Sequence, residues 1–484
     1  MPTVQELTQP SEIMRIILPQ MVQLRAAYEG GMAFKQNVLI KKQSESAPLF
    51  KDKIDNVAGQ PVCKSIVEEM IDIIFESDPI RDIKYKGKSS EPVWMKDFLD
   101  NADLEKNTLT NVMEKAATLA SIEGWSWIAV DLPDLAVANN RPYLCVASAE
   151  QIIDWEYDQE GYGAKLECLR VIEYQDAEKI IISQWDAGHV EIDPVTGLTI
   201  NEPTTAKRYI IELRSNSQGA TTNVEPDEIY TFPSDYPIPY IQLVPVPDLR
   251  NRFIGNSDIV EAADVQRELL RLEAEAFDSI RFAKPLIRAS AGMQIPAGGG
   301  GIARGEKDSV EVFEIPTADI SEIRNQQNSI ITFLDSYLGR GAVRKQTAET
   351  QSGVSIIEER KGLHRKAATR ARVLAATEEE IFTLVGWMMG LVWDGSVEYN
   401  TDYEARDTQY RLSLLQTAKN LSTNATVQAI IDEEVIRLIA PPDKLNEMLK
   451  KVAQPEINNI NRSTTDVPLG DAMPTDMPAA QTLQ

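Results

Sequence analysis

The stretch "NSDIVEAADVQRELLRLEAEAFDSIRFAKPLIR", residues 256–288, decides how the chain can fold. It predicts a charged helix from about Asp258 to about Lys284. Acidic residues lie in its first turns and Arg281 lies near its end, as the helix dipole prefers. Pro285 disfavours a helical conformation at the residue before it. At about 1.5 Å per residue, such a helix is a rod of roughly 40 Å.

The segments that follow repeat the rod in the opposite direction. An insert at 291–317 contains four glycines (298–301) and one strand-like segment, "SVEVFEI". A second helix, from about Asp319 to Leu338, adds roughly 30 Å. A basic loop, "GRGAVRKQTAETQSG" (339–353), then leads through Gly353 into a long helix at 354–393. Two antiparallel rods joined by an insert suit the wall of a channel better than a binding pocket.

The long helix separates apolar from basic side chains. On a helical wheel one apolar arc of about 140° is formed by Ile356, Ile357, Leu363, Ala367, Ala368, Ala371, Leu374 and Ala375. Basic residues border this arc: Lys361, Arg365 and Arg372 on one side, Lys366 and Arg370 on the other. We expect the arc to pack and the basic borders to face a second surface.

Charge is distributed unevenly along the chain. The whole protein of 484 residues has a formal net charge of −25, which argues against general coating of nucleic acid. From Arg340 to Arg372, nine Lys or Arg stand against three Glu, so this segment carries +6 and the rest carries −31. The basic segment could face a polyanion or the acidic surface of a neighbouring subunit. A solvated helix face with internal ion pairs is the alternative.

The remaining chain divides into a helical part, a β part and a C-terminal helical part. Helices are predicted at 11–29, at 54–76 and from 94 to Gly124. Short β-branched and aromatic runs between 125 and 247 predict a mainly antiparallel β segment. A short strand is expected at 396–403, followed by helices at 406–421, 424–439 and 442–452. The last 32 residues, 453–484, are rich in proline and are expected to be disordered.

No arrangement of residues predicts catalysis, a metal site or a cofactor. The two histidines, His189 and His364, are not part of an HExxH or Cys/His cluster, and no GxSxG motif occurs. Three separated cysteines indicate a reducing compartment and buried thiols. "GGIARGEK" places Gly300, Gly305 and Lys307 nearly as a phosphate-binding loop requires, but Glu306 intervenes and no Ser or Thr follows. No run is long and apolar enough for a membrane span, so we expect no membrane partner.

The order of these segments resembles the portal proteins (head-to-tail connectors) of tailed bacteriophages. "ETQSGVSIIEERKG" is similar to the family's E-T-x-S-G segment, here Glu349, Thr350, Ser352 and Gly353. The stretch from Asn256 and the segments "QPVCKSIVEEMIDIIFESDP" (60–79) and "IPYIQLVPVP" (238–247) are similar to further family segments. The resemblance covers roughly residues 10–450.

The resemblance implies an α+β, mainly helical portal architecture. It would divide the chain into a wing with mixed α/β structure (1–257), a first stem helix (258–290), a clip (291–317) and a second stem helix (318–338). A tunnel loop (339–353), a long kinked helix with a wing return strand (354–405), a helical crown (406–452) and a disordered tail (453–484) would follow.

The resemblance also implies function. Such a protein forms a homo-oligomeric ring, usually a dodecamer, at the portal vertex of the virion capsid, after assembly in the host cytoplasm. It has no enzymatic activity, and its partners are double-stranded DNA, the large terminase, a head-tail adaptor, and the major capsid and scaffolding proteins. The tunnel-loop residues expected at DNA are Arg340, Arg344 and Lys345. The basic candidates of the stem and clip are Arg281, Lys284, Arg288, Arg304 and Lys307.

Two other functions are compatible with the sequence. A different structural head-tail connector, such as an adaptor or a baseplate component, would share the charge and the missing catalytic motifs without a DNA channel. A metal-dependent DNA-processing enzyme is the second alternative, because the many carboxylates permit a two-metal site, although no local pattern singles any of them out.

Overall fold

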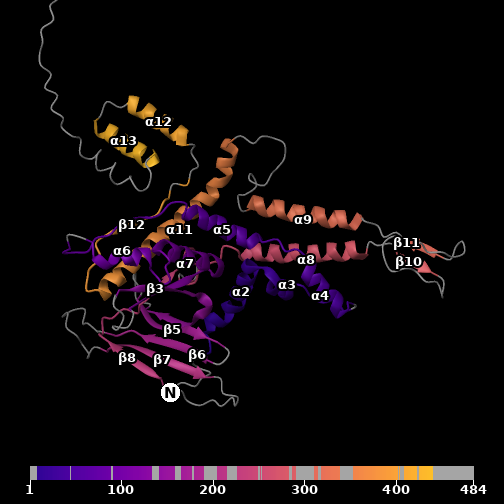
Figure 1. The fold of residues 1–484 in the computed structure, drawn as a ribbon, viewed down its shortest axis with the longest axis horizontal. Coiled ribbons are helices and arrows are strands. Elements are labelled where there is room, and N and C mark those ends of the chain that lie inside the picture. The colour runs from indigo at the N-terminus through magenta and orange to yellow at the C-terminus, as the bar shows by residue number, and fades with distance from the viewer. Residues whose placement is uncertain are drawn as a thin grey trace, which may run out of the picture. The chain divides into compact units, whose positions relative to one another are not determined.

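The structure is a computed structural model of the whole chain. It describes residues 8–43, 45–88, 91–132, 141–158, 165–176, 179–189, 204–214, 226–248, 251, 253–282, 286–289, 310–313, 318–337, 353–401, 403, 408–421 and 425–439. The chain divides into two compact units, Met1–Glu404 and Ala405–Gln484, which are described separately. The fold is α+β, as predicted (Figure 1).

The first unit begins with a cluster of helices. They are α2 (Glu12–Glu29), α3 (Gly31–Val38), α4 (Ala47–Asn56), α5 (Val62–Ile74), α6 (Val93–Asp100) and α7 (Leu109–Glu123). Side-chain hydroxyls begin three of them: Ser11, Ser46 and Thr108 each accept a hydrogen bond from the backbone N–H three residues later. Such N-caps satisfy a donor that the first turn would otherwise leave without a partner.

Two long helices that the sequence predicted are each divided in two. The helix expected at 54–76 is interrupted between α4 and α5, where Pro61 precedes the first residue of α5 and disfavours a helical conformation at the residue before it. The helix expected from 94 to Gly124 stops at Asp100. There the Asn101 and Asp103 side chains bind the backbone N–H groups of residues 105–107. These local bonds compete with the helical ones.

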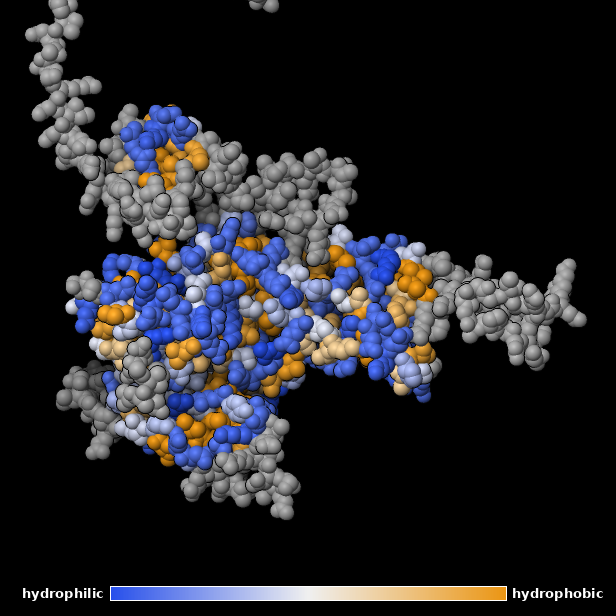
Figure 2. Space-filling model, viewed as in Figure 1, coloured by the Kyte–Doolittle hydropathy of each residue, from blue (hydrophilic) through white to orange (hydrophobic). Residues whose placement is uncertain are grey.

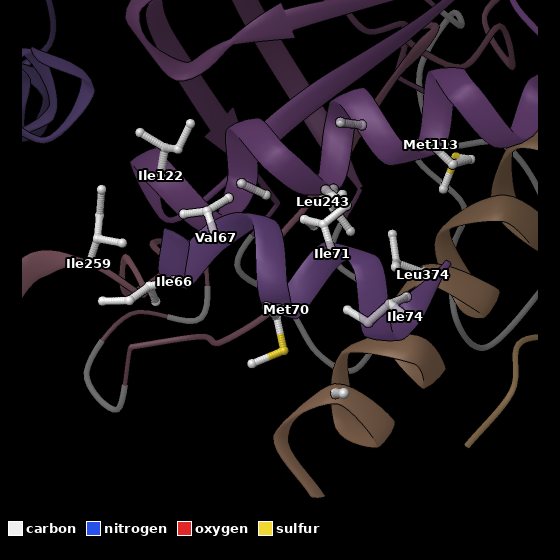
Figure 3. Packing of buried hydrophobic residues seen from close by; sticks show 14 of the residues in the cluster. Ile66, Val67, Met70, Ile71, Ile74, Met113, Ile122, Leu243, Ile259 and Leu374 are labelled. Carbon is white, nitrogen blue, oxygen red and sulfur yellow. The ribbon is translucent and has the colours of Figure 1, made fainter. Parts of the chain in front are cut away.

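Helix α5 lies at the centre of the larger hydrophobic core. Its buried residues include Ile66, Val67, Met70, Ile71 and Ile74. Figure 3 shows them between α7 on one side and the long helix that contains Leu374 on the other. Burial of this face against two helices explains why the apolar positions recur at helical spacing.

The β region is antiparallel, as the sequence predicted, and it forms two sheets. The three-stranded sheet has the order β3-β2-β9, and the five-stranded sheet has the order β4-β5-β6-β7-β8. Their strands are β2 (Ser126–Asp131), β3 (Tyr143–Ser148), β4 (Ile152–Tyr157), β5 (Leu166–Gln175), β6 (Lys179–Asp186), β7 (Ala206–Arg214), β8 (Glu228–Phe232) and β9 (Tyr240–Leu243). A 3-10 turn, η1 (Ala149–Gln151), joins β3 to β4. Trp125 and Trp127 are fully buried between these elements and helix α2.

The rod of two helices is present, with a hairpin between them. It consists of α8 (Val260–Phe282), β10 (Leu286–Ala289), β11 (Val310–Phe313) and α9 (Ala318–Tyr337). β10 pairs antiparallel with β11, which confirms the strand expected within "SVEVFEI". The first stem helix, expected to reach residue 290, ends at Phe282, and residues 286–289 form a strand instead. Pro285 explains the change, since it cannot donate the helical hydrogen bond.

Helix α11 (Gly353–Met388) is the last helix of the first unit among the described residues and is shorter than the helix predicted at 354–393. Gly390 adopts a left-handed φ of +65°, and the Leu391 N–H bonds to the carbonyl of Gly386. This is the common glycine-based way to end a helix. The strand expected at 396–403 is β12 (Ser396–Glu398), and it pairs antiparallel with β1 (Ile80–Asp82).

The second unit contains two described helices, α12 (Thr408–Leu421) and α13 (Ala425–Ile439). They agree with the helices expected at 406–421 and 424–439. They pack against each other, with an ion pair between Lys419 and Asp432. The helix expected at 442–452 and the tail at 453–484 lie outside the described residues.

Candidate nucleic-acid channel segment

The candidate channel segment is the rod of α8 and α9 together with α11. Figure 1 shows α8 and α9 side by side, with the β10–β11 hairpin at their shared end. Leu269 and Leu270 of α8 and Leu334 of α9 are buried and belong to the larger core. The rod surface is mixed, and Figure 2 shows hydrophobic areas on it among hydrophilic ones. Ile280 and Phe333 are 52% and 67% exposed.

A polar clamp joins the two rod helices at mid-length. Arg324 of α9 donates through Nη2 to Oε1 of Glu273 on α8, at 3.1 Å. Gln327, only 3% exposed, donates to the other carboxylate oxygen at 3.0 Å and accepts from Arg324 at 2.8 Å. Burial raises the pKa of Glu273, but the hydrogen bonds from Arg324 and Gln327 outweigh it and lower the pKa overall. The clamp fixes the register of one helix against the other.

Buried polar groups hold the base of the rod to the helical body. Gln266 of α8 is 2% exposed and donates to the backbone carbonyl of Ala27 at 2.7 Å. Its oxygen accepts from the N–H of Cys63 at 2.8 Å, in the first turn of α5. Buried polar groups need such partners, since each unsatisfied one costs about 1–3 kcal/mol. One glutamine therefore fixes α8 to both α2 and α5.

A lysine cluster holds α8 farther along the rod. Lys53 of α4 is 4% exposed, and its Nζ lies 2.8 Å from Oδ2 of Asp278 and 2.7 Å from Oε1 of Glu45. Two carboxylates around one buried ammonium compensate its loss of hydration. The roles of Gln266, Gln327 and Lys53 were not predicted from the sequence. The available signal was a polar residue within an apolar helical stripe, as Gln266 is between Ala263 and Leu269.

Arg370 links α11 to the start of α8. The sequence analysis placed Arg370 on a basic border of α11, but the side chain is buried and forms an ion pair with Asp258. Its Nη1 also lies 3.3 Å from Sδ of Met70. Burial raises the pKa of Asp258, and the nearby Arg370 charge opposes that effect. Arg370 is thus an internal anchor and is not available to a polyanion.

Other basic residues of α11 remain at the surface. Arg365, Lys366 and Arg372 are exposed, while Leu363, Ala367, Ala368, Ala371 and Leu374 of the predicted apolar arc are buried. The second half of the helix is anchored by Glu378, which is fully buried, accepts from Tyr399 at 2.8 Å and pairs with Arg81. The packing arc is therefore confirmed from Leu363 to Leu374, and the basic border at three residues. The side chains of Ile356, Ile357 and Lys361 lie outside the described residues.

Most residues predicted to meet DNA lie outside the described residues. These are Arg340, Arg344, Lys345, Lys284, Arg304 and Lys307, together with Glu349, Thr350 and Ser352 of the family-like motif. Backbone positions alone are described for three others: Arg281 in the last turn of α8, Arg288 in β10, and Gly353 at the start of α11. The DNA-facing roles of all these residues stay predictions.

The described rod helices are acidic. α8 contains six Asp or Glu against three Arg, and α9 contains three Asp or Glu against one Arg. Arg324, the only cation of α9, is held by the Glu273 clamp. An acidic surface repels phosphate and cannot hold DNA tightly.

Over the part of the chain that the structure describes, neither a metal site nor a membrane-spanning helix is present. There, no group of three or more His, Cys, Asp or Glu side chains is placed to hold a metal ion. None of the described helices is both long enough and apolar enough to cross a membrane. The cysteines are free; Cys63 is buried, and burial raises its pKa to about 12. Cys145 is exposed, so the expectation of uniformly buried thiols was wrong.

Comparison with known proteins identifies no family. No protein-family model matches the sequence, and no curated protein matches it. Among solved structures, the fold is similar to a chain in the neck of an empty GTA particle computed with C6 symmetry. That likeness has a TM-score of 0.43 and 11% identity, and covers 78% of this chain and 91% of the other. A chain in the neck of a native GTA particle, computed with C12 symmetry, has a TM-score of 0.39 and 12% identity, with 81% and 94% covered.

Proposed function

We propose that this protein is a portal: a ring-forming head-tail connector at one vertex of a phage-like capsid, through which double-stranded DNA passes. The observation that carries the proposal is the rod. Two antiparallel helices, α8 and α9, lead to a β hairpin and return, and α11, whose first half is basic, follows after the segment 338–352. This is the element order that the resemblance to portal proteins implies for stem, clip, tunnel loop and long helix.

The charges support passage of DNA without tight binding. In a ring, every charge of the rod is repeated once per subunit, so an acidic rod would form an acidic channel wall. Such a wall repels phosphate and lets a duplex of any sequence move. Arg340, Arg344 and Lys345 of the predicted tunnel loop would supply the few rings of cations that contact phosphate without reading bases. The wall needs no chemistry of its own, and the proposal includes no catalytic step.

The buried contacts of α8 support a rod that keeps its orientation relative to the helical body when force acts on it. Gln266, Lys53 and Arg370 attach α8 to α2, α5, α4 and α11, and all three are buried. A terminase that docks at the hairpin end and pushes DNA inward would exert force on the rod. Breaking a buried ion pair costs about 3–5 kcal/mol, and leaving the Gln266 amide unsatisfied costs about 1–3 kcal/mol. Force on the rod would therefore be transmitted to the body of the subunit.

Negative-stain electron microscopy of the purified protein tests the proposal. We expect top views with a central channel, most simply with twelve subunits. Class averages without a channel would contradict the portal and favour another structural component of the head or tail. Mg²⁺-dependent cleavage of DNA by the protein alone would contradict it in favour of an enzyme.

The tunnel-loop residues provide a second test. We expect the triple substitution of Arg340, Arg344 and Lys345 by alanine to leave the ring intact and to change DNA retention or packaging. Loss of the ring in this variant would place the three residues at subunit contacts and refute their assignment to the channel.

A further inference from the structure

An acidic groove lies in the first unit, beside helices α2 and α7. Its walls come from α2, α7, β3, η1 and β5, and its volume is about 890 Å³. A second hollow of about 420 Å³ adjoins it between α5 and α7, and the two share Tyr28, Glu114 and Thr118. We call the two together the acidic groove.

Carboxylates dominate the lining of the acidic groove. Seven of them stand against two cations, Arg25 and Lys115; the seven are Glu29, Glu68, Asp72, Asp103, Glu114, Glu150 and Glu173. Asp72 and Glu114 are exposed, and among the described residues neither side chain forms a hydrogen bond or an ion pair. Their charge is therefore not compensated within the subunit.

Arg25 shows the same excess of negative charge at the groove wall. Its guanidinium is shared by three carboxylates: Glu29 at 3.4 Å, Glu123 at 3.4 Å and Glu150 at 2.9 Å. Glu123 is completely buried, and its Oε1 accepts no hydrogen bond from the part of the chain described. Arg25 is thus shared by the two groove carboxylates Glu29 and Glu150 and by a buried carboxyl group behind them, so it cannot fully compensate the two groove carboxylates.

The chain itself carries the complementary surface. Arg365 and Arg372 of α11 are exposed, and neither forms an ion pair within the described parts. They are seven residues apart, so they lie on the same face of the helix, separated by roughly 10 Å along its axis. Other sides of α11 contact α5, β9 and β12 of its own subunit. Arg372 borders a hollow that β9 also lines, but its side chain and that of Arg365 stay exposed to a second molecule.

We infer that the acidic groove receives the basic face of α11 from a second copy of this chain. The inference rests on the proposed ring and adds where its subunits meet. A closed ring needs a heterologous interface, in which one surface of a subunit contacts a different surface of the next. The acidic groove and the Arg365–Arg372 face are two such surfaces on one chain, with opposite charge. Ion pairs between them fix the orientation of neighbours and exclude a groove-to-groove contact, where like charges would repel.

Reciprocal charge reversal tests the inference. One variant carries Asp72→Lys and Glu114→Lys, a second carries Arg365→Glu and Arg372→Glu, and a third combines all four. We expect each of the first two to reduce the ring fraction at least about tenfold, as measured by native mass spectrometry at low salt, and the combined variant to recover most of it. Lys86→Glu with Lys88→Glu is the matched control, since it changes the charge of another exposed segment by the same amount as the α11 variant.

Cross-linking supplies a measurement that does not depend on stability. In a Cys145→Ser background, one copy carries Thr118→Cys in the groove and another carries Thr369→Cys on the α11 face. Mixed copies treated with a short bis-maleimide should give a cross-linked dimer of the two kinds, and neither copy alone should.

The outcomes separate this inference from the proposed function. Absence of rings in the wild-type protein would refute the portal itself. Wild-type rings that persist unchanged in both charge variants, without cross-linking of mixed copies, would overturn the inference while the portal stands. The groove would then belong to a different partner protein.

Discussion

Arg370→Met should loosen the attachment of α8 to α11 more than any substitution at the surface of either helix. The Arg370 and Asp258 side chains are 7% and 12% exposed, so water screens their ion pair little. Methionine keeps much of the length of arginine but removes the charge. The variant then leaves the Asp258 carboxylate buried without its cation, beside Ile259, which is fully buried.

The expected magnitude follows from that burial. Removing one member of a buried ion pair typically costs about 3–5 kcal/mol, whereas replacing both members by uncharged groups is often close to neutral. We therefore expect Arg370→Met to lower the opening free energy of α8 by about 3–5 kcal/mol. Asp258→Asn in the same molecule should recover most of the loss.

Native-state hydrogen exchange, followed by mass spectrometry, measures this opening locally. Peptides that cover residues 258–270 and 363–375 report on the two ends of the ion pair. Arg365→Met is the matched control, because Arg365 lies on the same helix and is exposed. If the opening free energy of α8 fell no more in Arg370→Met than in Arg365→Met, the role of Arg370 as an anchor would be refuted. If Arg370→Met with Asp258→Asn were as unstable as Arg370→Met alone, the uncompensated charge of Asp258 would not be the cause of the lost stability.

Two further predictions concern Glu123 and the glycine beside it. Burial raises the pKa of Glu123 to about 7 from its usual 4.5, although Arg25 and the Ala149 N–H favour the charged form. The folded state then keeps this proton to higher pH than the unfolded chain, so stability falls as pH rises from about 4.5 to 7, by up to about 3 kcal/mol. Glu123→Gln should remove this pH-dependent loss of stability. Thermal midpoints measured against pH test this, and parallel curves for the wild type and the variant would contradict the attribution of the loss to Glu123. Gly124→Ala should cost about 2–4 kcal/mol, because φ is +97° and a Cβ would lie 2.3 Å from the Gly255 carbonyl oxygen. Gly390→Ala is its control: φ is +65° but no atom lies within 4 Å, so a smaller midpoint shift is expected there and an equal one would refute the steric argument.

Local patterns in the sequence were enough to predict most elements of secondary structure. Some features depend only on residues that are close in the sequence, so they could be predicted without the tertiary structure. Examples are the acidic first turns of α8, its end before Pro285 and the apolar arc of α11. The antiparallel β segment between 125 and 247 was predicted for the same reason. Errors occurred where a local bond competes with a helix, as at Asn101 and Asp103, or where a strand depends on a distant partner, as β10 depends on β11.

The sequence by itself determined the composition of the candidate channel segment: two rod helices, an insert, a basic segment of +6 and an acidic remainder. Only the tertiary structure decided which charged side chains are exposed to another molecule and which are paired inside the subunit. It placed Arg370 beside Asp258, 112 residues away along the chain, and so removed this arginine from the basic surface. It also gathered Glu29, Asp72 and Glu114 from three helices into one groove. Charge along a sequence is a sum over residues, whereas burial and pairing depend on contacts between segments that only the folded chain brings together.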